Sequence, residues 1–154
     1  MKRVLITILF MTGCAFMMSA QELEGFGDYA VIPREKVIEK FGNPETYQIE
    51  DHDVSDPVGE YYYYDGLTLA FEDRVISRFG IKKRGIRVLT KTIPGGVQVG
   101  DNFSKISSLQ IHNRGVKGDG TTQYDYWCKG DDTSKLTFYV KNNIIQRISF
   151  VVVP

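Results

Sequence analysis

The sequence has little cysteine, little histidine and no excess of either charge. Two cysteines and two histidines occur among 154 residues, and 19 Lys and Arg balance 19 Asp and Glu. This balance excludes the broad basic field by which proteins attract nucleic acid. His52 and His112 both lie in polar segments, so a nucleophile, a base and an orienting group cannot be assembled on a recognisable motif. We therefore expect neither an enzyme nor a nucleic-acid partner, and no cofactor.

A long apolar run occurs at the start of the chain. Lys2 and Arg3 precede the apolar residues 4–11, and Ser19-Ala20 ends the segment with small side chains. This is the layout of a secretory signal peptide, and the run is too short for a membrane span of roughly 20 residues. We predict a signal peptide over residues 1–20, no transmembrane span in the mature chain, and export to the periplasm or the exterior.

Cys14 leaves a second interpretation of this segment open. Met11-Thr-Gly-Cys14 resembles the box at which bacterial lipoproteins are cut and lipidated, although Met stands where Leu is usual and apolar residues follow. An outer-membrane lipoprotein, acting as an assembly factor anchored through Cys14, is therefore an alternative. After cleavage at Ala20, Cys128 would be the one remaining cysteine, so no intrachain disulfide could form.

The rest of the chain contains an internal similarity. Residues 67–81 align with residues 136–150 at a constant offset of 69, so that Leu67 meets Leu136 and Arg78 meets Arg147. Each copy has a polar pair, Asp73-Arg74 or Asn142-Asn143, which indicates a two-residue hairpin loop between alternating runs. Upstream, the tyrosine-rich residues 60–64 align with residues 123–127. The sequence predicts three antiparallel strands in each copy.

A helix is expected before each set of strands. Residues 33–41 begin with Pro and end before Gly42, and residues 101–109 place apolar side chains at helical spacing. Residues 96–100 read as a turn and helix entry, and residues 86–90 as a candidate linking strand. We predict an α+β fold in which residues 21–154 form a single domain of two tandem helix-plus-antiparallel-sheet repeats, about 30–85 and 96–154. One helix cannot stabilise one short sheet alone, so the helices should pack on one face of shared strands.

Several segments of the sequence resemble those of a known protein architecture. Val31-Ile-Pro-Arg-Glu-Lys-Val-Ile-Glu-Lys-Phe-Gly-Asn-Pro44, an aromatic strand and the Leu67-Thr-Leu-Ala-Phe71 hairpin are similar to the repeat of the β-lactamase inhibitor protein and of small outer-membrane lipoproteins of the barrel assembly machinery. Residues 96–106 resemble the same helix entry in the second copy. The resemblance implies export, a tandem α/β repeat and protein recognition by an exposed sheet face. It does not imply inhibition of a lactamase, because no inhibitory loop matches residue by residue.

Strand alternation divides the side chains between two faces. Leu67 and Leu136 should face the helices, whereas Thr68, Ala70, Thr137 and the two arginines should face away. The tyrosine strands can take either parity, so one of two aromatic sets is exposed. The first set is Tyr61, Tyr63, Tyr124 and Tyr126, and the second is Tyr62, Tyr64 and Trp127. We predict a partner-binding surface formed by Tyr61, Tyr63, Arg78, Tyr124, Tyr126, Tyr139 and Arg147.

Tyrosine and arginine on a rigid sheet are residue types that dominate protein interfaces. The favoured function is therefore a non-enzymatic protein-binding or scaffold module of the cell envelope, with another envelope or extracellular protein as partner. The tyrosines can equally be cross-strand packing pairs. A second class of function is a carrier or hydrolase of envelope glycans or peptides, with Asp131 or Asp132 as the acid. The acidic segment 50–56 lacks EF-hand spacing and reads as a polar turn, so we expect no metal site.

Overall fold

The structure is a computed structural model that describes residues 21–24, 34–50, 59–72, 74–90, 93–128 and 134–152. The described residues form eleven strands, one α-helix and one 3₁₀ helix. In chain order these are β1 (Gln21–Glu24), α1 (Arg34–Phe41), β2 (Thr46–Glu50), β3 (Gly59–Tyr64), β4 (Leu67–Glu72), β5 (Val75–Ile81), β6 (Ile86–Thr90), β7 (Ile93–Gln98), η1 (Phe103–Lys105), β8 (Asn113–Val116), β9 (Thr122–Trp127), β10 (Ser134–Lys141) and β11 (Ile144–Val152).

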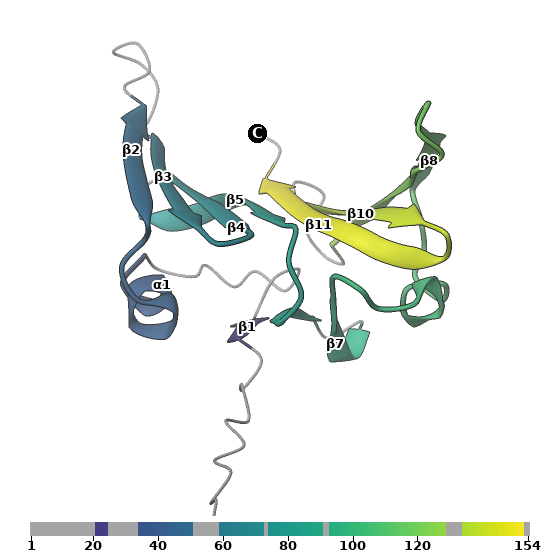
Figure 1. Ribbon diagram of the computed structural model, residues 1–154, viewed down its shortest axis with the longest axis horizontal. Helices are drawn as coiled ribbons and strands as arrows, with labels where there is room; N and C mark the ends of the chain where they lie inside the picture. The colour runs from purple at the N-terminus through teal and green to yellow at the C-terminus, as the bar shows by residue number, and fades with distance from the viewer. Residues whose placement is uncertain are drawn as a thin grey trace, which may run out of the picture.

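One eight-stranded sheet dominates the molecule. Its strand order is β2-β3-β4-β5-β11-β10-β9-β8, and every neighbouring pair is antiparallel. The strands therefore run inward from each edge in chain order, and β5 and β11 join the two halves at the centre. Figure 1 shows that this sheet is curved, with the edge strands β2 and β8 rising on the same side. We call that side the concave face.

The two predicted central hairpins are present. Strands β4 and β5, and likewise β10 and β11, are joined by two-residue turns. Asn142 and Asn143 both have positive φ, 52° and 64°, which is the backbone of a type I′ turn and matches the twist of the flanking strands. A register shift follows Ala70 in the first hairpin and Tyr139 in the second, positions that are 69 residues apart. The bulges thus occupy matching positions in the two hairpins.

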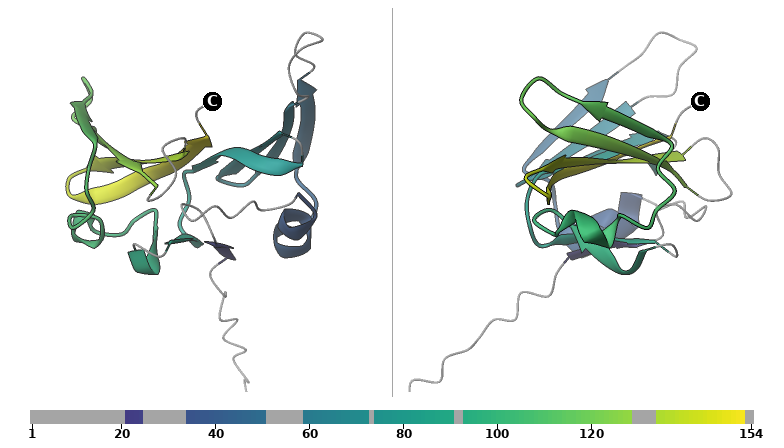
Figure 2. Two further views of the ribbon diagram at one scale, coloured as in Figure 1. Left: turned by 180° about the vertical axis from the view of Figure 1, so that it is seen from behind. Right: turned by 90° about the vertical axis from the view of Figure 1, so that its right-hand side faces the viewer.

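The hydrophobic core lies against the convex face of this sheet. Leu67 and Leu136 are 1% and 0% exposed, as the alternation predicts. The core also takes in Val88 and Val97 from a smaller sheet of order β1-β6-β7. Figures 1 and 2 show this smaller sheet, α1 and η1 together on the side opposite to the concave face. The concave face is left open between the two raised edges.

Helix α1 is attached to the first half of the sheet through its apolar side and its first residue. Val37 is buried, and Ile38 and Phe41 pack against the core. The helix ends where Gly42 takes φ +77° and donates its N–H to the carbonyl of Ile38. At the other end, the Arg34 guanidinium donates to both carboxylate oxygens of Glu60 on β3, at 2.9 and 2.8 Å. Within the described residues no helix is long and apolar enough to cross a membrane.

The expected helix over residues 101–109 is wrong. Only Phe103–Lys105 form a helical turn, of the 3₁₀ type, with the side chain of Asn102 accepting from the Ser104 N–H. Ser107 donates its hydroxyl to the carbonyl of Ser104, a local bond that competes with helical pairing. The turn and helix entry expected over residues 96–100 is also wrong in part, because β7 runs to Gln98.

The predicted fold class is therefore wrong as a whole. The described chain is a sheet-dominated fold with a single α-helix, and it does not pack helices on a sheet in two repeats. A strand over residues 86–90 is confirmed as β6. The division into repeats of about 30–85 and 96–154 stays a prediction. The signal peptide, Cys14, most of the acidic segment 50–56, Asp131 and Asp132 lie outside the described residues.

Candidate functional site

The concave face can be read from the strand register, because residues paired across neighbouring strands point to the same side. In the first half, Ala70 pairs with Tyr61 and with Arg78, and Thr68 pairs with Tyr63 and Gly80. All six are on the side opposite to buried Leu67 and Leu69. Tyr61, Tyr63 and Arg78 therefore share one face, the concave one, as the sequence predicts.

The second half contributes the matching strands. Tyr139 pairs with Arg147 on one side and with Gln123 on the other, and Thr137 pairs with Ser149 and Asp125. Tyr139 and Arg147 are half-buried and lie on the concave face. Five of the seven predicted binding residues are thus brought onto one surface.

Tyr124 and Tyr126 lie on the other face, and the expectation that they accompany Tyr61 and Tyr63 is wrong. Tyr126 pairs with Leu136 and is 6% exposed, and Tyr124 pairs with Phe138 and packs on Phe103 with ring centroids 4.7 Å apart. The register makes Gln123, and not Tyr124, the residue opposite Tyr139, just as Tyr61 is opposite Ala70. Our alignment of the tyrosine strands was one residue out, and a slip of one residue exchanges the faces of a strand.

Tyr62 and Tyr64 occupy the core side in the first half. Tyr62 is 6% exposed and contacts Phe71 with ring centroids 5.0 Å apart. Burial raises the pKa of the Tyr62 phenol and of the Tyr64 phenol, since it disfavours the charged phenolate. Trp127 pairs with Lys135 and is on the same side as Thr137, so each of the two exposed sets proposed from the sequence is divided between the faces.

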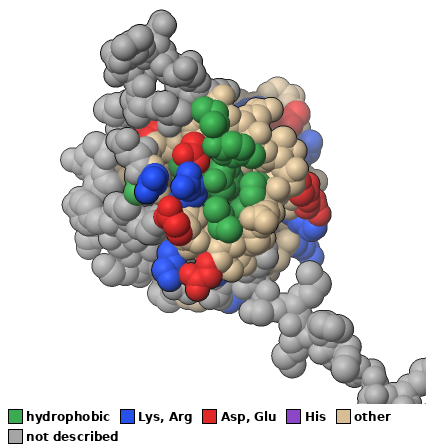
Figure 3. Space-filling view, turned by 90° about the vertical axis from the view of Figure 1, so that its left-hand side faces the viewer, with side chains coloured by type: hydrophobic (Ala, Val, Ile, Leu, Met, Phe, Trp, Pro, Cys, Tyr) green, Lys and Arg blue, Asp and Glu red, His purple; other side chains and the backbone are tan. Residues whose placement is uncertain are grey.

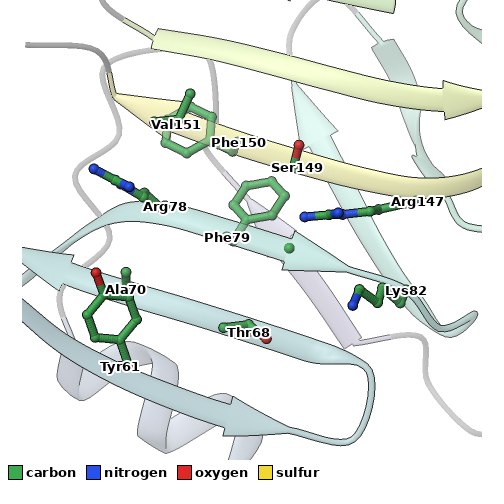
Figure 4. A pocket seen from close by; sticks show the side chains of 11 residues that line it. Tyr61, Thr68, Ala70, Arg78, Phe79, Lys82, Arg147, Ser149, Phe150 and Val151 are labelled. Atoms are coloured by element: carbon green, nitrogen blue, oxygen red, sulfur yellow. The ribbon is translucent and has the colours of Figure 1, made fainter. Parts of the chain in front are cut away.

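A pocket of about 380 Å³ lies at the middle of the concave face, where β5 and β11 meet. Figure 4 shows its walls, which come from β3, β4, β5 and β11. The lining residues include small ones at the floor, and Gly80 pairs directly with Ser149 there. The full set is Tyr61, Thr68, Ala70, Arg78, Phe79, Gly80, Lys82, Arg147, Ser149, Phe150 and Val151.

Three cations line this pocket. Arg78 is two residues before Gly80 in the chain and Lys82 is two residues after it. Arg147 is on the neighbouring strand β11. A Cβ placed on Gly80 would be 3.8 Å from Nη2 of Arg147, so the guanidinium lies over the glycine. Figure 4 shows Arg147 directed across β5 toward the centre of the pocket and Arg78 directed away from it. The Arg147 guanidinium is thus within van der Waals distance of the floor of the pocket.

The ring of Tyr139 contacts Arg147 and a further cation, Lys117. The guanidinium carbon of Arg147 is 5.1 Å from the ring centroid of Tyr139, and Nζ of Lys117 is 4.6 Å from the same centroid. Both distances are within the range of a cation–π interaction. The Nε of Arg147 is buried and donates to no acceptor among the described residues. Arg147 is thus positioned by a ring while its hydrogen-bonding capacity is not used up.

In the part of the chain that the structure describes, carboxylates do not balance these cations. Asp125 pairs with Thr137 on the same face, and its carboxylate accepts from Thr137 at 2.8 Å and from Gln123 at 3.0 Å. Asp125 is 5% exposed. Within the described ranges, no ion pair joins Arg78, Lys82 or Arg147 to an acid. The open charge of the pocket is therefore positive.

Sequence reasoning missed Lys82, Gly80 and Ser149. Lys82 begins the basic run Lys82-Lys83-Arg84, and continuing the alternation from Arg78 through Gly80 would have placed it on the concave face. Ser149 pairs with Gly80 only because β5 and β11 are neighbours. No sequence signal shows that pairing.

The residues weighed for other chemistry lie elsewhere. His112 contacts Trp127 edge-on with ring centroids 5.8 Å apart, and Cys128 is buried at 2% exposure. Among the residues that the structure describes, no three His, Cys, Asp or Glu side chains gather as a metal site would require. The edge strand β2 exposes Tyr47 and Ile49, and Figure 3 shows hydrophobic side chains gathered at that end of the molecule among charged ones.

No protein-family model matches the chain, and no curated protein is similar to it. Three solved structures are similar at low sequence identity. An extracellular protein containing an SCP domain from Bacillus anthracis is 10% identical with a TM-score of 0.46, over 79% of this chain and 43% of that one. A DUF4309 family protein from Bacillus subtilis is 11% identical with a TM-score of 0.39, over 78% of both chains. A candidate β-lactamase inhibitor protein from Streptococcus mutans is 11% identical with a TM-score of 0.33, over 86% of this chain and 91% of that one.

This chain thus spans less than half of the B. anthracis protein. All three TM-scores are below 0.5, so the similarities assign neither a fold nor a function. One of the three similar structures has the description of a β-lactamase inhibitor protein, at 11% identity, whereas the tandem repeat and the kinship with barrel assembly lipoproteins stay predictions.

Proposed function

We propose that the protein is an exported, non-enzymatic binding module that holds a partner protein on its concave face. The observation that carries the proposal is the placement of Tyr61, Tyr63, Tyr139, Arg78 and Arg147 on one curved sheet surface around a pocket of about 380 Å³. The apolar run that follows Lys2 and Arg3 supports the export.

The rigidity of this surface favours binding. Each tyrosine is carried by a strand with hydrogen-bonded neighbours on both sides, so little conformational freedom remains to be lost when a partner binds. Tyrosine and arginine are also the side chains most often found as energetic anchors. A concave surface, open between β2 and β8, can surround a convex segment of another protein and exclude water from these anchors.

A crosslinking experiment tests the proposal. A photoreactive amino acid at Thr68 would be presented on the concave face, and the same amino acid at exposed Lys36 on α1 would report the opposite side. We expect cells of the source organism to yield a discrete crosslinked protein from position 68 and not from position 36. Equal crosslinking of the same protein from both positions would contradict a concave binding face.

The crosslinked protein, once purified, allows a matched pair of variants to be compared by calorimetry. Replacing Tyr139 by Ala removes a concave anchor and should weaken binding by about 2 kcal/mol, roughly thirtyfold. Replacing Tyr47 by Ala removes an exposed tyrosine from the β2 edge and should change the affinity less than twofold. Equal losses in the two variants would place the interface elsewhere.

A further inference from the structure

The pocket at the centre of the concave face has a charge pattern that identifies the chemistry of its occupant. Arg78, Lys82 and Arg147 line it, and in the described part of the chain none of them is paired with a carboxylate. Like charges gathered without counter-charges repel one another, and an anionic group relieves that repulsion when it binds. We propose that this pocket binds an extended acidic segment of the partner protein, with carboxylates at positions i and i+2. This inference rests on the proposed function.

The first carboxylate subsite is above Gly80. Arg147 lies over this glycine, and Lys82 is two residues beyond Gly80, directly after the end of β5, where a continued register would place it opposite Arg147. Guanidinium groups bind carboxylates through paired N–H donors, and an ammonium group nearby adds a second positive charge. The hydroxyl of Ser149, which pairs with Gly80, is available at the floor. An acidic side chain entering here would meet three donors from two strands.

The second subsite is at the rim of the pocket, where the Arg78 side chain is directed outward from the centre. Arg78 is two residues from Gly80 on β5, and two residues of an extended strand span about 6.6 Å. Alternate side chains of an extended peptide have the same spacing and point to the same side. A segment lying along β5 would therefore present one carboxylate over Gly80 and the next toward Arg78.

The remaining lining favours a protein segment over a bare polyanion. Ala70, Phe150, Val151 and the ring of Tyr61 provide carbon surface around the cations. The methylene groups of a glutamate side chain and the backbone of a peptide can cover such surface, whereas a phosphate chain cannot. Phosphate is nonetheless an anion of compatible size, so the experiment includes it as a competing outcome.

The experiment uses the whole mature protein and short peptides with blocked ends. The probe is acetyl-Thr-Glu-Thr-Glu-Thr-amide, which is extended by preference and has carboxylates two residues apart. One control replaces both glutamates by glutamine, and a second, acetyl-Thr-Thr-Glu-Glu-Thr-amide, has the same composition with adjacent carboxylates. Amide resonances of the protein are followed during titration at constant ionic strength, and tripolyphosphate is titrated in parallel.

We expect the probe to shift the amides of Gly80 and Ser149, with at least tenfold weaker binding of the glutamine peptide and several-fold weaker binding of the isomer. The Arg147→Gln variant should lose at least tenfold in affinity. The matched control Arg114→Gln removes the same charge beside Tyr124, on the other face, and should change the affinity less than twofold. Arg147→Lys keeps the charge but loses the paired donors, and should bind with intermediate affinity.

Several results would overturn the inference. Equal losses in Arg147→Gln and Arg114→Gln would show attraction by net charge alone, and stronger binding of tripolyphosphate at Gly80 would assign the pocket to phosphate. Absence of shifts at Gly80 and Ser149 would remove the pocket from consideration. Thermal unfolding of each variant shows whether it is folded, and a misfolded Arg147→Gln leaves Arg147→Lys and Lys82→Gln to decide.

The outcome is distinguishable from that of the proposed function. Crosslinking from Thr68 together with an unchanged affinity in Arg147→Gln would keep the concave interface and reject the acidic anchor. Binding of the probe in the pocket without any crosslinked protein would keep the anion site and reject the protein partner.

Discussion

The assignment of Tyr63 and Tyr126 to opposite faces predicts opposite effects on stability. These two tyrosines are equivalent in the sequence alignment, yet Tyr126 is 6% exposed in the core whereas Tyr63 is half-buried on the concave face. Truncating Tyr126 to Ala removes a ring that contributes by its burial and leaves a cavity among residues such as Leu136. The expected loss is about 3 to 4 kcal/mol.

Truncating Tyr63 to Ala should remove few stabilising contacts. Its hydroxyl donates to Gln48 in an exposed position, at 3.2 Å, and its ring faces away from the core. We expect a loss of about 1 kcal/mol or less. For 154 residues the entropy of unfolding is about 0.3 kcal/mol/K, so Tyr126→Ala should lower Tm by about 10 °C and Tyr63→Ala by about 3 °C.

Thermal and urea unfolding followed by circular dichroism measure both variants. The m-value should be the same in each, which shows that the midpoint change reflects stability and not compactness. Equal losses, or a greater loss at Tyr63, would refute the register of β9 against β10 and with it the assignment of faces.

Two further predictions concern the turns of the second half. Asn142 has φ 52°, so Asn142→Gly should be neutral or slightly stabilising, whereas Asn142→Val should lower the free energy of unfolding by about 1 to 2 kcal/mol in the same urea assay; no difference between the two would contradict the type I′ turn. In the β8–β9 turn, hydrogen bonds from the backbone N–H and the hydroxyl of Thr121 lower the pKa of Asp119 below its ordinary value. A pKa lowered by folding stabilises the protein above the unfolded pKa of about 3.9, and this contribution disappears as the pH falls through the folded value. The urea midpoint of Asp119→Asn should therefore depend less on pH between pH 5 and the acid limit than that of the parent, and an identical pH profile would contradict the assigned bonds.

The central hairpins could be predicted because their signals are local. The Asn142-Asn143 pair, the alternation on either side and the constant offset of 69 together specify which residues face each other. The tyrosine strands could not be placed in the same way. Their parity depends on the lengths of the connections to β4 and β10, which differ between the halves, so one residue of misalignment moved Tyr124 and Tyr126 to the wrong face.

The two helical segments could also be predicted only in part from the sequence. Arg34 and Phe103 are 69 residues apart, and each donates its backbone N–H to the turn of the adjacent hairpin, at Arg74 or Asn143. The position of the second helical segment was therefore predictable, but its type was not. Serines at 104 and 107 form local hydrogen bonds there that a spacing argument does not weigh.

The central pocket could be anticipated only in part. The arginines at 78 and 147 were predicted to share a face because they align, but the sequence does not tell that β5 and β11 are neighbours. The pairing of β5 with β11 brings Ser149 next to Gly80, although the two residues are 69 positions apart in the chain. It also brings Lys82 close to them. Long-range pairing of this kind is decided by the whole core and has no local signature.

The direct pairing of Gly80 with Ser149 gives the central pocket a mechanical role. Arg78 is in β5, Lys82 directly follows that strand and Arg147 is in β11, so an occupant that touches all three bridges the line along which the large sheet would separate. By mass action, such a molecule resists parting of the two strands in proportion to the logarithm of its concentration. Slower exchange of the amide hydrogens of β5 and β11 would then report occupancy, even where no change of shape accompanies binding.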